Sequence, residues 1–117
     1  MMLRWFYLSV LLPAGLIAQT FNTGTFFGTI TDSSGAAVPG ATIRITRVDP
    51  PLTREAITDA GGNFQVQQVP VGQYRFEFEK TGFQKVVRSG IDLSAGQSLR
   101  VDTTLNVGSV RRFVMVP

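Results

Sequence analysis

The residue types that most often carry chemistry are scarce in this chain of 117 residues. It contains no histidine and no cysteine, which excludes zinc sites with His or Cys ligands, a cysteine nucleophile and a Ser/His/Asp triad. The two lysines, Lys80 and Lys85, lie in polar surroundings that do not favour a Ser–Lys pair. Asp32 and Asp59 fall in glycine-rich turns, where carboxylates usually bind turn amides. The sequence therefore predicts a protein that is not an enzyme and needs no cofactor.

Oxygen ligands and positive charge lead to similarly limited expectations. Asp32, Asp59 and Asn63 could share one end of the fold, as calcium ligands do, but their spacing matches no calcium loop. No metal site is predicted.

The net charge of +3 comes from basic residues scattered along the chain, with only Arg111 and Arg112 adjacent. Because nucleic-acid binding proteins usually gather positive charge into a patch or run, we expect no nucleic-acid partner.

The N-terminal segment has the three-part layout of a secretory signal peptide. Arg4 precedes an apolar stretch over residues 5–17, and Ala18 offers a small residue for cleavage. That stretch is too short to cross about 30 Å of hydrocarbon as a helix. We predict a signal peptide over 1–18, export, and no transmembrane span in the mature chain. Residues 19–24 are interpreted as a linker.

The rest of the chain alternates apolar and polar residues, which is typical of half-buried strands. Turn-forming residues separate these runs every 8–15 residues or so, the spacing of an antiparallel sandwich. The pattern predicts an all-β, seven-stranded antiparallel β-sandwich of Greek-key type with strands over 25–31, 41–47, 53–58, 63–69, 73–79, 84–93 and 97–106. The predicted core comprises Ile30, Ile43, Ile45, Phe64, Val66, Val69, Tyr74, Phe76, Phe78, Phe83, Leu93, Leu99, Val101 and Leu105.

A series of short turn and core motifs stands in a familiar order. Its residues are Gly28, Asp32, Gly40, Asp59, Gly62, Phe64, Pro70, Gly72, Tyr74, Gly82 and Phe83. This order resembles the carboxypeptidase-regulatory-like domain, a prealbumin-like sandwich related to Cna B-type repeats. The resemblance covers about residues 25–106 and leaves 107–117 as a C-terminal tail or linker stub.

The motif residues also have physical interpretations. We expect Asp59 to bind turn amides ahead of Gly62, and Gly72 to let the chain bend before Tyr74. The Tyr74 hydroxyl is expected to bind a nearby backbone group, as in a tyrosine corner. Gly40 and Gly82 are expected at positions that a Cβ would obstruct.

The resemblance implies an accessory role. Such domains stand beside catalytic or transport domains in exported proteins, including the N-terminus of TonB-dependent outer-membrane receptors, directly after the signal peptide. It therefore implies a location in the periplasm or at the outer membrane, with a protein partner or downstream receptor domains. Many Cna B relatives form a Lys–Asn isopeptide bond, which needs a lysine on the first strand. Residues 25–31 contain none, so no isopeptide is predicted.

Two kinds of binding surface remain open. The alternative function is that of a carbohydrate-binding module, because starch-binding-like domains share this shape, and glycans usually stack on exposed aromatic rings. The only tryptophan, Trp5, leaves with the signal peptide, Tyr74 is in phase with the core, and either Phe26 or Phe27 must point outward. For a protein partner, the last strand and the segment 111–117 are the candidates, because unpaired strand edges can add a partner strand.

Overall fold

The alternation of side chains along the first strand sets the pattern for the fold. β1 places Gly24, Phe26, Gly28 and Ile30 inward, and the residues between them outward. The structure, a computed structural model, describes residues 22–108, which contain β1 (Thr23–Asp32), β2 (Thr42–Arg47), β3 (Leu52–Ile57), β4 (Asn63–Pro70), β5 (Gly72–Glu79), β6 (Val86–Leu93), β7 (Ser98–Arg100) and β8 (Thr103–Leu105). No helix occurs in this part of the chain, so it offers no helical membrane span.

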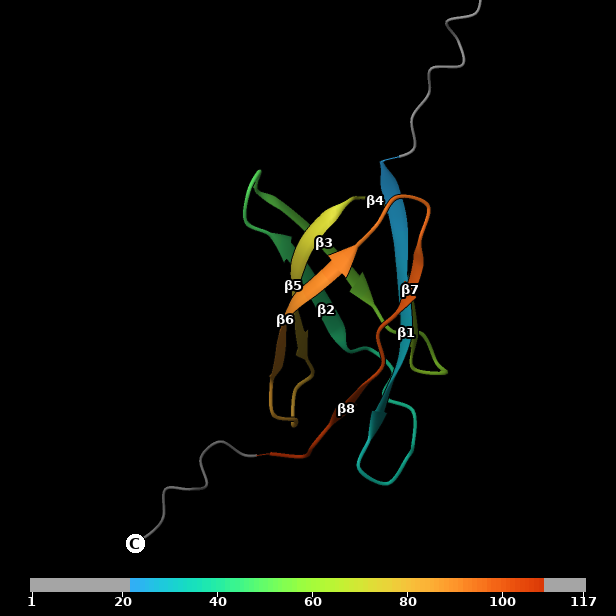
Figure 1. Cartoon of the computed structure of the whole chain (residues 1–117). Helices are drawn as coiled ribbons and strands as arrows, with labels where there is room; N and C mark the ends of the chain where they lie inside the picture. The colour runs from blue at the N-terminus through green and yellow to red at the C-terminus, as the bar shows by residue number, and fades with distance from the viewer. Residues whose placement is uncertain (1–21, 109–117) are drawn as a thin grey trace, which may run out of the picture.

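Two four-stranded sheets face each other (Figure 1). One has the order β4-β1-β7, with β8 also paired to β1, and the other has the order β3-β2-β5-β6. The buried side chains of both sheets form one core between them. The predicted all-β sandwich is therefore confirmed.

The last predicted strand differs from the structure. The single strand predicted over 97–106 is divided into β7 and β8, so the described residues hold eight strands rather than seven. Both pair in parallel with β1, because the chain crosses from β6 of the facing sheet before β7 begins. The prediction of a wholly antiparallel sandwich is wrong at this edge. Between β7 and β8, the Thr29 N–H donates to the Asp102 carboxylate (2.9 Å) rather than to a backbone carbonyl, which explains the break in the ladder.

Most of the predicted core is buried, with a few corrections. Phe83 and Leu99 are only partly buried, because Phe83 lies at the β5–β6 turn and Leu99 lies on the short edge strand β7. Phe26, Val38 and Ala41 are core residues that the prediction lacks. Phe26 lies edge-to-face against Phe76 (4.7 Å between ring centroids) and Tyr74 (5.5 Å), an arrangement that aromatic rings favour.

A buried hydroxyl that the sequence analysis did not identify fixes the chain between β1 and β2. Thr58 is buried, with 4% of the residue exposed. Its hydroxyl donates to the Val38 carbonyl (2.7 Å) and accepts from the Ala41 N–H (2.8 Å). Both backbone groups therefore have partners in a region that water does not reach.

Several predicted segments lie at the limits of the described residues. The signal peptide (1–18), half of the linker (19–21) and the tail from residue 109 onward fall outside them. The linker prediction is wrong at its end, because Thr23 and Gly24 already belong to β1 and pair with β4. Residues 107 and 108, assigned to the tail, pair with the β5–β6 turn. The Gly108 N–H donates to the Gly82 carbonyl (3.2 Å), and Val107 forms a bridge with Phe83. These two residues of the predicted tail therefore lie against the sandwich.

Candidate functional site

The two turn carboxylates of the motif series bind their own turns. Asp32 Oδ1 accepts from the Ser34 N–H (2.8 Å), the Ser34 hydroxyl (2.6 Å) and the Ala36 N–H (3.0 Å). The hydrogen bond from the Ser34 side chain, followed by those from turn amides, lowers the pKa of Asp32. Asp59 Oδ1 accepts from the N–H groups of Gly61 (3.0 Å) and Asn63 (2.9 Å). These carboxylates stabilise turns, and residues 22–108 contain no acidic cluster that could hold a metal ion.

Two of the aromatic residues of the series lie in the core, and Pro70 accepts a hydrogen bond from one of them. The buried Tyr74 donates its hydroxyl to the Pro70 carbonyl (2.6 Å), four residues earlier, as the tyrosine-corner interpretation requires. Burial raises the pKa of this phenol, although Arg47 and Arg54 oppose the shift. Phe64 is buried in the core, whereas Phe83 lies at the edge of the core beside Val107.

Three glycines of the series lie where a Cβ would come too close to a neighbouring residue. At Gly28 a Cβ would overlap the Val101 carbonyl, and at Gly62 (φ 77°) it would lie 2.6 Å from the Ile30 carbonyl oxygen. At Gly72 it would lie 2.8 Å from the Arg47 side chain.

The steric interpretation of the other two motif glycines is wrong. A Cβ on Gly82 would meet no atom within 4 Å, and one on Gly40 would meet only the flexible end of Lys80. Both glycines instead have positive φ, at 92° and 74°, which other residues rarely adopt.

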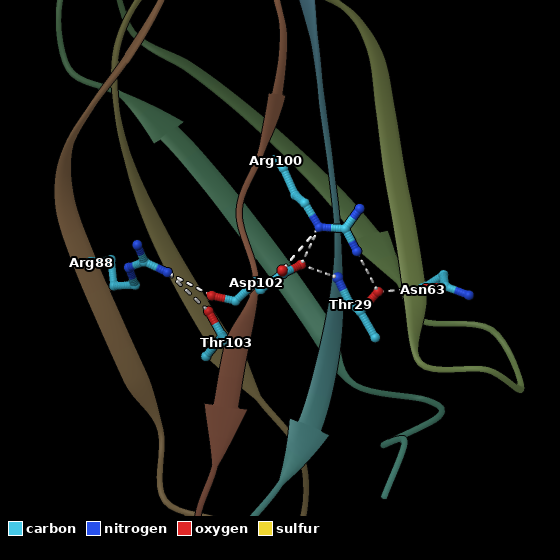
Figure 2. Close-up of polar contacts among 6 residues, drawn as sticks. All are labelled: Thr29, Asn63, Arg88, Arg100, Asp102 and Thr103. Atoms are coloured by element: carbon cyan, nitrogen blue, oxygen red, sulfur yellow. Dashed lines mark hydrogen bonds and ion pairs between the residues drawn. The ribbon is translucent and has the colours of Figure 1, made fainter. Parts of the chain in front are cut away.

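A polar network covers the outer face of the β4-β1-β7 sheet (Figure 2). The Thr29 hydroxyl donates to Asn63 Oδ1 (2.7 Å) and accepts from an Arg100 Nη (3.3 Å). Arg100 Nε also binds both carboxylate oxygens of Asp102 (2.9 and 3.1 Å), and its guanidinium lies 5.3 Å from the centre of the Phe27 ring. The network joins three neighbouring strands and covers the only aromatic ring on this face of β1.

Asp102 is the centre of the junction between β7 and β8. Its carboxylate binds Arg100 and the Thr29 N–H on the outer side, and its backbone carbonyl accepts from Arg88 Nη1 (2.8 Å) on β6. Figure 2 shows Arg88 on one side of this chain segment and Arg100 on the other. Burial would raise the pKa of Asp102, but the hydrogen bonds from Arg100 and Thr29 and the nearby arginine charges outweigh it and lower the pKa.

The lowered pKa of Asp102 predicts a pH-dependent contribution to stability. Because its folded-state pKa lies below the usual value of 3.8, its contribution is fully present above about pH 4 and is lost as the pH falls through the folded-state pKa. We expect Asp102→Asn to lower the free energy of unfolding by about 1 kcal/mol at neutral pH, since the site is half exposed. The difference from the wild type should shrink as the pH falls below about 4, in urea titrations at several pH values. Arg100→Gln should reduce the pH dependence of stability that Asp102 causes. If Asp102→Asn and the wild type still differed as much below about pH 4 as at neutral pH, the stabilising role of the Asp102 carboxylate would be contradicted.

The outer face of the other sheet is an ion-pair surface. Glu77, whose side chain is 13% exposed, lies 3.2 Å from Arg44, 2.9 Å from Arg75 and 3.8 Å from Lys85. Arg44 also binds Glu55 (2.9 Å). Opposite charges satisfy one another here, so the surface offers a solvated, charge-balanced face rather than an acid–base pair.

A shallow cleft of about 690 Å³ lies where β1 begins, between the end of β4 and the turn before β7. Its lining residues are all uncharged: Thr23, Gly24, Thr25, Gln67, Gln68, Ala95, Gly96, Gln97 and Ser98. These groups can form hydrogen bonds, but they include no acid, base or thiol for catalysis.

The aromatic side chains do not provide an exposed stacking platform in the part of the chain that the structure describes. Phe26 and Tyr74 are buried, and Phe27, the phenylalanine that points outward, is half-buried with Arg100 over its ring. Residues 22–108 therefore give no support to the carbohydrate-binding alternative, which would be expected to use such a surface.

The facing sheets, the turn carboxylates and the tyrosine corner define a prealbumin-like β-sandwich domain. A family model of the carboxypeptidase regulatory-like domain matches residues 25–106. The chain belongs to this family.

Comparison with known proteins adds a relative and two structural neighbours. The chain is 35% identical over 101 residues to the TonB-dependent transporter Oar of Myxococcus xanthus; the match covers 82% of this chain but 9% of the transporter. A chlorocatechol 1,2-dioxygenase from Pseudomonas putida has a TM-score of 0.60 at 14% identity, covering 73% of this chain and 60% of the other. The Bacillus anthracis TIE protein has a TM-score of 0.63 at 13% identity, covering 74% and 17%. At these identities the structural neighbours show the shared fold alone.

Proposed function

We propose that this chain is an exported, non-catalytic structural or interaction module that serves as the N-terminal accessory domain of a TonB-dependent receptor-like outer-membrane protein. The observation that carries the proposal is the 35% identity to the transporter Oar over 101 residues, which cover 82% of this chain. The domain would act in the periplasm or at the outer membrane, with downstream receptor domains or another protein as its partner.

The chemistry of the described surfaces supports a non-catalytic role. The carboxylates of the motif series bind turn amides, the Asp102 carboxylate binds Arg100 and a strand amide, and the ion pairs on the other face are mutually satisfied. A carbohydrate-binding function has less support, because Tyr74 is buried and Arg100 covers the Phe27 ring.

The proposal is tested by locating the native protein in its own cells and measuring its intact mass. An antibody against the folded domain is used on periplasmic, outer-membrane, inner-membrane and cytosolic fractions. We expect a species that begins at Gln19, in the periplasm or as part of a larger outer-membrane protein. Chemical crosslinking before fractionation should then join the domain to a transporter.

Other outcomes of this experiment would contradict specific parts of the proposal. An unprocessed chain in the cytosol or the inner membrane would overturn export. A processed periplasmic protein that is never crosslinked to a transporter would overturn the receptor-associated role while leaving export intact.

A further inference from the structure

One row of paired residues crosses the whole β3-β2-β5-β6 sheet and has an arginine at each end. In this row Arg54 pairs with Ile45, Ile45 with Phe76, and Phe76 with Arg88. Directly paired residues place their side chains on the same face of a sheet. Ile45 and Phe76 are fully buried, so the row faces the opposite sheet. The side chains of Arg54 and Arg88 therefore also extend from the inward face of their edge strands.

Both guanidinium groups reach across to the backbone of the facing sheet. Arg54 donates to the carbonyls of Gln67 (2.7 Å) and Gln68 (3.2 Å) on β4. Arg88 donates to the carbonyl of Asp102 (2.8 Å) and to the Thr103 hydroxyl (3.3 Å), as Figure 2 shows. Each arginine therefore connects an edge strand of one sheet to an edge strand of the other.

The two edges differ in how suitable they are for further pairing. Among the described residues, β3 pairs only with β2, in an unbroken register from Arg47↔Leu52 to Thr42↔Ile57. Its Ile57 side chain is 67% exposed. β6 instead has a register shift opposite Tyr74–Phe76, next to Gly90 with φ 74°. Such bulges disfavour the addition of another strand, whereas a regular edge with an exposed apolar residue invites it.

We propose that β3 is a latent pairing edge for the β3 strand of a second copy of this chain, and that Arg54 keeps this edge closed. An added strand would extend the sheet past Arg54 and cover its guanidinium, which is costly for a charged group held near the surface. In a two-fold antiparallel pairing of two β3 strands centred on position 54, Arg54 would lie opposite Arg54 and Leu52 opposite Ala56, so replacing the arginine removes a like-charge pair and leaves apolar contacts. This inference concerns self-association and does not depend on the proposed receptor role.

The test compares three variants of the purified protein, expressed with its own N-terminal segment so that the cell's processing is retained. Arg54→Val removes the inward charge, and Arg54→Lys keeps a charge but loses the paired carbonyl contacts. Arg88→Val removes the equivalent connection at the edge that already has a bulge. Light scattering after size-exclusion chromatography, over a wide concentration range, measures association. Urea unfolding measures the stability of each variant separately.

We expect Arg54→Val to form dimers with a dissociation constant at least about tenfold below that of the wild type. Arg54→Lys and Arg88→Val should remain monomeric although both are destabilised.

Three results would overturn the proposal. The first is an Arg54→Val protein that is folded and monomeric at every concentration. The second is equal association of Arg88→Val, and the third is association that follows the loss of stability in all variants. If Arg54→Val does not fold, Arg54→Gln provides the same comparison, because its amide can still donate to a β4 carbonyl without carrying a charge.

Discussion

Replacing Phe26 by alanine should reduce the free energy of unfolding by about 3–5 kcal/mol, the usual cost of removing a buried aromatic ring. Phe26 is fully buried on the central strand of its sheet and contacts the rings of Phe76 and Tyr74 from the facing sheet. The cavity would therefore open in the middle of the core, where backbone ladders on both sides limit collapse. Urea unfolding followed by circular dichroism measures the effect.

The neighbouring Phe27 provides a matched control. It has the same side chain on the same strand, but it points outward and is half-buried beneath Arg100. Phe27→Ala should cost only about 1 kcal/mol, mostly from the lost contact with the guanidinium. Equal losses for the two variants would show that the inward and outward assignments along β1 are wrong.

Gly28→Ala is expected to have the second large effect, a loss of at least about 3 kcal/mol. The added Cβ would overlap the Val101 carbonyl, which is backbone and cannot move aside as a side chain could. Relief of the overlap would displace the chain between β7 and β8 from β1. The amide protons of Val101 and Thr29 should then exchange faster with solvent, because the first bonds to Phe27 and the second to Asp102 across this junction.

Gly82→Ala separates this steric effect from a general effect of losing glycine. A Cβ at Gly82 would meet no neighbouring atom, so only its φ of 92° opposes the substitution. We expect a loss of about 1–2 kcal/mol, with unchanged exchange at Val101 and Thr29. A smaller loss for Gly28→Ala than for Gly82→Ala would contradict the close approach of β1 and Val101.

The strands could be predicted well because their signal is local. Alternation over Ala41–Arg47 and Tyr74–Glu79 defines which face of each strand is buried, and the turn residues between runs mark the ends. The same rule settles β1, because Phe26 and Ile30 are four residues apart and share a face, whereas Phe27 does not. Without this alternation, the two adjacent phenylalanines do not reveal which of them points inward.

The parallel edge could not be predicted because its causes are distant in sequence. The alternation of residues 97–106 is compatible with one antiparallel strand, and nothing local reveals that Asp102 bonds to Thr29. Arg54 and Arg88 were missed for a related reason. Each occupies a position in phase with buried residues, and a charge at such a position is a signal, but its carbonyl partners become visible only when both sheets are in place.

The parallel pairing of the first and last strands has a mechanical consequence. β1 starts beside β7 and ends beside β8, so the described chain enters at one end of the sandwich and leaves at the other (Figure 1). Tension applied through the two termini would pull β1 and the β7–β8 segment in opposite directions along their length. The hydrogen bonds between them would then bear the load together, in shear, rather than opening one after another. Built this way, the sandwich can resist a pull along its length without its strands separating one hydrogen bond at a time.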